Sequence, residues 1–137
     1  MAEGLLRHKI KEQGLDWQVD SAGTNSYHTG EAPHRHSQKV CLQNGIDISA
    51  QRARTFTPAD FDTYDIIYAM ADDVYREISR MGGRHAQMGK VAYFLNELEP
   101  GSNRSVPDPW YGDEDGYAPV FELINRTCDA IIEKYKH

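Results

Sequence analysis

The sequence predicts a single α/β domain over residues 1–137, a three-layer sandwich in which helices cover a short parallel sheet. Its length of 137 residues and mass of 15.6 kDa suit one domain with one core. Helical and strand patterns alternate along the chain, which is typical of parallel α/β folds. Two of the strand segments, Tyr64–Met70 and Lys90–Leu95, are apolar on both faces, as strands covered on both sides are.

The elements follow one another in a regular order. Helices are expected at residues 2–13, 33–44, 58–61, 72–81 and 117–135, and strands at 17–23, 64–70 and 90–95. Such an order would normally open with a strand, whose carboxyl end helps to form a ligand crevice. This sequence opens with a helix, so a first strand is expected to be missing from it.

Local signals justify the first three helices. Leu5, Leu6 and Ile10 fall on one face of the first helix. Proline opens the next two, since Pro33 and Pro58 stand where a helix has no need of an N–H donor.

The remaining elements end or pack in equally characteristic ways. The helix at residues 72–81 stops at Gly82-Gly83. The closing helix places apolar residues on one inner side, namely Val120, Leu123, Ile124, Ala130 and Ile131. The segment from Trp17 to Gly23 is expected to be a strand that runs into a glycine turn.

Composition excludes several classes of protein. A hydrophobic fraction of 39% and a charged fraction of 26% are those of a globular domain rather than a disordered chain. No apolar run approaches the roughly 18 residues of a membrane span, and the amino end lacks a secretion signal. We therefore expect a cytoplasmic protein without membrane contact. A net charge of −6 makes nucleic acid an unexpected partner.

The two cysteines and one pair of histidines are expected to be structural. Cys41 and Cys128 both lie in predicted helices, where they fit as small buried apolar side chains rather than as a disulfide. His34 and His36 have no nearby cysteine or carboxylate to complete a tetrahedral set, so we expect a solvated face and no metal.

The strongest chemical candidate is the segment Val106-Pro107-Asp108-Pro109-Trp110-Tyr111-Gly112. Two prolines restrict the backbone around one acid, and two large aromatic residues follow it. A carboxyl group shielded by aromatic rings can stay protonated and deliver a proton to the leaving oxygen of an aromatic substrate. Taken alone, such a segment is more often a simple turn.

Taken together, seven segments make the sequence resemble the low molecular weight protein tyrosine phosphatase family over essentially its whole length. The segments are Met1-Ala2-Glu3; Asp20-Ser21-Ala22-Gly23-Thr24; Tyr27-His28-x-Gly30-x-x-Pro33; Asn44-Gly45-Ile46; Arg52-Ala53-Arg54; Asp60-Phe61-x-x-Tyr64-Asp65-x-Ile67-x-x-Met70; and the acid segment at 106–112.

The resemblance implies hydrolysis of phosphotyrosine through a cysteinyl-phosphate intermediate, with no cofactor. In that family a loop of pattern Cys-x5-Arg-Ser/Thr follows the first strand, and its backbone N–H groups and arginine hold the phosphate. In this sequence the sixth residue after Cys41 is Asp47 and the sixth after Cys128 is Lys134. The nucleophile loop is thus expected to be absent, and the 137-residue polypeptide to be a truncated, inactive copy.

The resemblance also assigns site residues. Asp108 matches the general acid, which later acts as a base toward water. Trp110, Tyr111 and Tyr27 match the aromatic walls around the phenyl ring of a phosphotyrosine-containing protein or a small aryl phosphate. Two departures stand out, because Gln51 replaces a histidine that braces the phosphate loop, and Ala71 replaces an acid that follows the middle strand.

Two alternatives remain. The chain could be a natural non-catalytic member that binds a phosphorylated partner or assembles with itself, because a missing central strand would leave sheet edges free to pair with another copy. If it does not pair in this way, its own strands would have to move together or it would fold poorly. The cysteine-relay arsenate reductases share the architecture but need further cysteines on a mobile segment.

Overall fold

The computed structural model describes residues 1–24, 29–107 and 116–136, and the chain in it forms two compact units. The first unit consists of Met1–Ser21, Gly30–Ala53 and Pro107–His137. The second consists of Ala22–Thr29 and Arg54–Val106.

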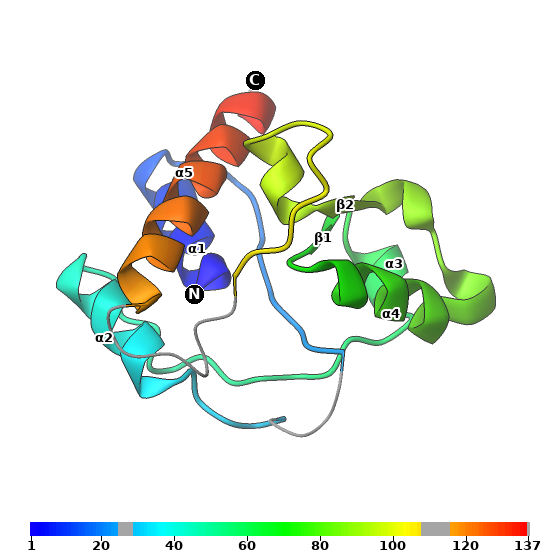
Figure 1. The fold of residues 1–137 in the computed structure, drawn as a ribbon, viewed down its shortest axis with the longest axis horizontal. Helices are drawn as coiled ribbons and strands as arrows, with labels where there is room; N and C mark the ends of the chain where they lie inside the picture. The colour runs from blue at the N-terminus through cyan, green and yellow to red at the C-terminus, as the bar shows by residue number, and fades with distance from the viewer. Residues whose placement is uncertain (25–28, 108–115, 137) are drawn as a thin grey trace. The chain divides into compact units, whose positions relative to one another are not determined.

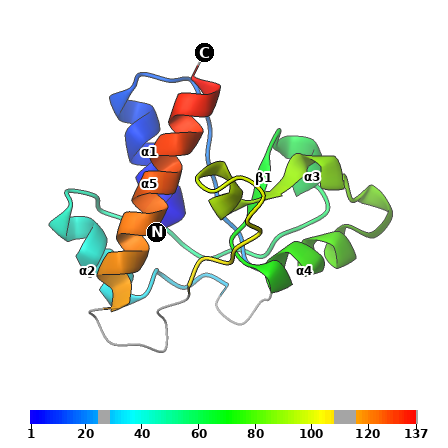
Figure 2. The same ribbon diagram turned by 45° about the horizontal axis from the view of Figure 1, so that its top comes forward.

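Helices make up the first unit. It contains α1 (Ala2–Glu12), α2 (Arg35–Gln43) and α5 (Tyr117–Tyr135). Figures 1 and 2 show α1 and α5 side by side, with α2 near the start of α5. Their buried side chains form an apolar core, which includes Leu5, Ile10, Val40, Cys41, Phe121, Ile124, Cys128 and Ile131.

A small parallel sheet lies in the second unit. Strands β1 (Ile67–Ala69) and β2 (Val91–Tyr93) pair in parallel, with Tyr68 opposite Ala92. The unit also holds α3 (Asp60–Thr63), α4 (Asp72–Gly82) and three 3₁₀ helices, η1 (Gly83–His85), η2 (Met88–Lys90) and η3 (Phe94–Glu97). Its apolar cluster is built from Phe56, Phe61, Ala69, Ile78 and Val91.

The alternation of helices with a short parallel sheet confirms the predicted α/β class. The bounds of α5 agree with the prediction, and those of α1 and α4 differ from it by one residue. The second helix begins at Arg35 rather than Pro33, because the His34 imidazole accepts a hydrogen bond from the His36 N–H and caps the helix there. The third begins at Asp60 rather than Pro58, after a turn in which the Asp60 carboxylate accepts the Thr57 N–H at 2.9 Å.

The predicted strand at residues 17–23 is wrong. A strand is defined by a ladder of hydrogen bonds to a neighbouring strand. Of residues 17–23, all of them described, only Gly23 pairs with another segment, in an isolated parallel bridge with Thr55. The Gly23 N–H donates to the Arg54 carbonyl at 2.8 Å, and its own carbonyl accepts the Phe56 N–H at 2.7 Å. The described residues therefore contain two strands where three were expected.

The described helices include none that is both long and apolar enough to cross a membrane.

Candidate active site

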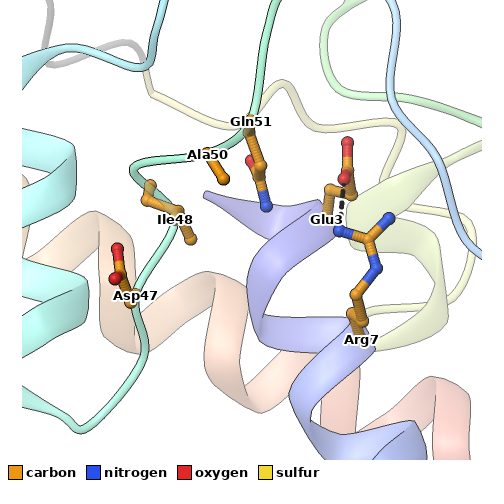
Figure 3. Close-up of a pocket in the computed structure, with 6 residues that line it drawn as sticks. All are labelled: Glu3, Arg7, Asp47, Ile48, Ala50 and Gln51. Atoms are coloured by element: carbon orange, nitrogen blue, oxygen red, sulfur yellow. Dashed lines mark ion pairs between the residues drawn. The ribbon is translucent and has the colours of Figure 1, made fainter.

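A pocket of 260 Å³ lies at the start of α1 in the first unit (Figure 3). It is lined by Glu3 and Arg7 of α1 and by Asp47, Ile48, Ala50 and Gln51 of the segment that follows α2. Figure 3 shows the Gln51 side chain directed toward the first turn of α1. One of the family-like segments, Met1-Ala2-Glu3, thus lies beside Gln51, the position that departs from the family pattern.

The Glu3 carboxylate is the centre of the polar contacts at this pocket. It accepts a short hydrogen bond from the Ser21 hydroxyl and pairs with the Arg7 guanidinium at 2.6 Å. Arg7 also donates to the Val19 carbonyl at 2.8 Å. The side chain of Glu3 is only 10% exposed, so these contacts compensate for its partial removal from water. They fasten the segment that ends at Ser21 to the first turns of α1.

Gly4 allows the segment at residues 47–51 to approach α1 closely. A Cβ atom at this position would lie 2.3 Å from Ile48 Cγ2 and 3.1 Å from Gln51 Nε2. The first distance is far inside van der Waals contact, so any larger residue would push Ile48 away. Glycine is therefore what brings Gln51 and Ile48 against the first turn of the helix.

In the second unit, Ser105 and Val106, at the start of the acid segment, are hydrogen-bonded beside the carboxyl end of β1. The Val106 N–H donates to the Met70 carbonyl at 2.7 Å, and the Ser105 hydroxyl accepts the Asp72 N–H at 2.9 Å. Ala71, the position where the family often has an acid, is in an extended conformation just before α4.

The next acid along the chain, Asp72, has its carboxylate already engaged. It accepts a short hydrogen bond from the Tyr93 hydroxyl and another from Arg76 at 2.6 Å. The Tyr93 hydrogen bond lowers the pKa of Asp72, with a smaller contribution from Arg76. Asp72 is thus an ionised acceptor with partners of its own.

The four side chains assigned from the sequence, Asp108, Trp110, Tyr111 and Tyr27, all lie outside the described residues. Their roles as general acid and aromatic walls therefore stay predictions.

Neither cysteine has the environment of a nucleophile. Cys41 and Cys128 are fully buried, as expected for small apolar side chains. Burial raises the pKa of the Cys41 thiol, and it raises the pKa of the Cys128 thiol to about 12. Because the thiolate is the reactive form, a catalytic cysteine needs its pKa lowered instead.

His34 and His36 do not form the solvated face that was expected. Their rings lie 5.5 Å and 5.3 Å from the ring of Tyr117, the first residue of α5, and both side chains are half-buried. Aromatic packing at the junction of α2 and α5 is the physical reason. Among residues 1–24, 29–107 and 116–136, no three metal-ligating side chains come together.

Sequence reasoning gave no role to several residues that the structure places in contact around these segments. The spacing of Glu3 and Arg7, four positions apart in a helix, is a signal that could have revealed their ion pair. No local signal points to the contacts of Ser21, Tyr93 or Ser105, because their partners lie 18 to 33 residues away.

Comparison with known proteins then decides the family. A family profile described as low molecular weight phosphotyrosine protein phosphatase matches residues 1–137. The chain belongs to this family. Its fold is accordingly the α/β fold of these phosphatases, which confirms the resemblance seen in the sequence motifs.

Individual relatives of this phosphatase-family chain agree with that result. A protein of Synechocystis sp., named for the low molecular weight protein-tyrosine-phosphatases, is 35% identical over 96% of this chain and 84% of its own length. The human low molecular weight phosphotyrosine protein phosphatase is 29% identical over 98% of this chain and 85% of its own length.

Solved structures give the same answer. A protein tyrosine phosphatase from Entamoeba histolytica superposes with a TM-score of 0.87, at 29% identity over 98% of this chain and 86% of that one. The Drosophila arginine phosphatase DARP superposes with a TM-score of 0.89, at 25% identity over 99% and 88% of the two chains.

Proposed function

We propose that Asp108, Trp110, Tyr111 and Tyr27 serve phosphotyrosine hydrolysis through a cysteinyl-phosphate intermediate. Asp108 protonates the tyrosyl oxygen as it leaves and then, as a base, activates the water that releases phosphate. Trp110, Tyr111 and Tyr27 stack on the phenyl ring of a phosphotyrosine-containing protein or a small aryl phosphate. The observation that supports this proposal most is the family match over all 137 residues, which includes the acid segment at 106–112.

A second part of the proposal concerns the 137-residue polypeptide itself, which we expect to be inactive. Arginine does not stand six positions after either cysteine, since those positions hold Asp47 and Lys134. Both thiols are buried with raised pKa values. The polypeptide therefore has no thiolate beside a phosphate-binding arginine.

The experiment compares the 137-residue polypeptide with a chimera in which a family strand and Cys-x5-Arg-Ser-Pro loop are fused ahead of Met1. We expect hydrolysis of p-nitrophenyl phosphate and of a phosphotyrosine peptide by the chimera and none by the polypeptide. A Cys→Ser change in the grafted loop is the matched control and should abolish turnover. Phosphoarginine is assayed in parallel, because one structural neighbour is named an arginine phosphatase.

Three results would contradict the proposal. Turnover by the 137-residue polypeptide that is lost on Cys41→Ser or Cys128→Ser would show that the nucleophile was misassigned. A folded chimera without activity would argue against the phosphatase reaction. A chimera that prefers phosphoarginine would argue against the aromatic substrate.

A non-catalytic module that binds a phosphorylated partner or assembles with itself is the second candidate. The observation that favours it is the two-stranded sheet, because each strand has one neighbour among the described residues and keeps one edge for pairing. Concentration-dependent dimer formation in light scattering, with no turnover by the chimera, would favour this candidate over the enzyme.

A further inference from the structure

Two tyrosine rings are stacked face to face in the second unit, where α4 packs against β2. Tyr75 lies near the start of α4, and Tyr93 is the last residue of β2. Their ring centroids are 4.8 Å apart, and the two ring planes are inclined by only 6°. Both side chains are half-buried, so neither ring is sealed away from solvent.

A stacked pair of phenols has a reactivity that other aromatic pairs lack. Stacked rings at this separation bring carbon atoms of one ring into van der Waals contact with the other. When a tyrosine loses an electron and its hydroxyl proton, the unpaired electron spreads onto the two ring carbons beside the oxygen, the ortho carbons. Two such radicals in contact can join through these carbons.

The hydroxyl of Tyr93 is already paired with a base. It donates a short hydrogen bond to the Asp72 carboxylate, which Arg76 also holds at 2.6 Å. The Tyr93 hydrogen bond lowers the pKa of Asp72, so the carboxylate is ionised and can accept a proton. The same hydrogen bond raises the pKa of Tyr93, so the phenol keeps its proton until it is oxidised. An oxidised phenol is a far stronger acid than a carboxylic acid, and its proton therefore moves to Asp72 as the electron leaves.

We propose that Tyr75 and Tyr93 are an oxidative modification site, at which a haem peroxidase and hydrogen peroxide form an intramolecular dityrosine cross-link between α4 and β2. Each ring loses one electron and its hydroxyl proton, and the Tyr93 proton passes to Asp72 while the Tyr75 proton passes to water. One carbon–carbon bond then forms between an ortho carbon of each ring. The hydrogens on these two carbons move to the oxygens and restore both hydroxyl groups. In total, two electrons and two protons leave the protein and reduce one hydrogen peroxide to two water molecules.

The test oxidises the full 137-residue chain with a haem peroxidase and hydrogen peroxide. Groups held together in one chain have an effective concentration in the mM range or above, so at about 10 µM protein, coupling within a chain should exceed coupling between chains by about 100-fold. We expect dityrosine fluorescence in a product that migrates as a monomer on a denaturing gel. Mass spectrometry should find a cross-linked peptide pair that is lighter by two hydrogen atoms and maps to positions 75 and 93.

Phenylalanine variants test the pair. Tyr75→Phe and Tyr93→Phe each keep an aromatic ring and remove one phenol, so each should abolish the monomeric fluorescent product. Tyr68→Phe is the matched control, because the Tyr68 hydroxyl also donates to a carboxylate, that of Glu97 at 2.7 Å, whereas the Tyr68 ring meets Phe94 edge-on. Its yield should equal that of the parent, and circular dichroism checks that each variant is folded.

Asp72→Asn tests the proton transfer separately. Asparagine keeps an acceptor oxygen but is no base, so the cross-link should form more slowly than in Asp73→Asn, which removes the same charge from the exposed neighbouring position. Equal rates in these two variants would overturn the role of Asp72. Monomeric product that persists in Tyr75→Phe or Tyr93→Phe, cross-links that map to other tyrosines, or fluorescence found only in dimers would overturn the cross-linking site. The peptide map of the parent chain decides this even if a variant fails to fold.

Discussion

At the scale of single residues, Gly4 shows how one side chain can determine the shape of a site. Its missing Cβ is what lets Ile48 and Gln51 lie against the first turn of α1, where Glu3 collects its hydrogen bonds. The sequence places Gly4 in a helix without explaining it, since glycine is a poor helix former. The explanation is the contact of Gly4 with Ile48, which lies 44 positions away in the sequence, so no local pattern reveals it.

Gly4→Ala should therefore destabilise the protein although alanine favours helices. The clash with Ile48 is expected to lower the free energy of unfolding by about 1–3 kcal/mol, against a gain of about 1 kcal/mol from helix propensity. Urea unfolding followed by circular dichroism measures the difference. Gly89→Ala is the matched control, because a Cβ there meets no atom within 4 Å. Equal or greater stability of Gly4→Ala would refute the close approach.

The two thiols provide a second prediction at this scale. Cys41 and Cys128 are fully buried with raised pKa values. Neither thiol of the native protein should therefore react with a disulfide reagent at pH 8. Reaction should follow only when urea opens the structure. Rapid labelling of one native thiol would contradict the structural role.

Cys128 should also make stability depend on alkaline pH. Its pKa rises from a reference value of 9.0 to about 12 on folding, so the unfolded chain loses its proton first. The stabilising contribution is complete below pH 9 and is lost as the pH rises toward 12, by about 4 kcal/mol at most. Cys128→Ala should have a flatter decline in unfolding free energy over this range. An unchanged slope would show that the thiol ionises alike in both states.

At the scale of elements, α3 depends on one ion pair. Arg54 donates two hydrogen bonds of 3.1 Å to the Asp60 carboxylate, which also accepts the Thr57 N–H. Asp60→Asn should cost about 2 kcal/mol, since hydrogen bonds to charged groups contribute more than neutral ones. Chemical denaturation measures the loss, with Asp62→Asn as the exposed control in the same helix. A loss no larger than that of the control would show that the Arg54–Asp60 ion pair does not stabilise α3.

Elements with a strong internal pattern were predicted well, and those defined by distant partners were not. The periodic apolar face of α5 identified it from Tyr117 to Tyr135. The predicted strand at 17–23 failed, because strand character depends on a ladder to another segment. Helices α2 and α3 begin later than predicted, because the His34 imidazole caps α2 and the Asp60 carboxylate holds a turn ahead of α3, and proline position alone reveals neither contact.

At the scale of the whole molecule, the single domain predicted over residues 1–137 calls for one cooperative unfolding transition. The two units consist of interleaved segments of the chain, and small single domains usually unfold in an all-or-none manner. Calorimetric and van't Hoff enthalpies should therefore agree. Two separate transitions would show that each unit is stable without the other.

The site could be predicted as a set of motifs but not as a geometry. Prolines and aromatics around an acid singled out Asp108, Trp110 and Tyr111, and the family resemblance supplied their roles, which stay predictions because these residues lie outside the described part of the chain. The contacts of Glu3 with Ser21 and of Ser105 with Asp72 join segments far apart in sequence, so only the fold could bring them together.

The dependence of Asp108→Asn on the leaving group tests the central claim most directly. In the chimera with the grafted nucleophile loop, we expect this change to slow phenyl phosphate hydrolysis by about 10²–10⁴-fold, the usual contribution of a general acid. The loss should be much smaller with p-nitrophenyl phosphate, whose leaving oxygen needs little protonation. Equal losses on both substrates, or none, would contradict the assignment of Asp108 as the general acid.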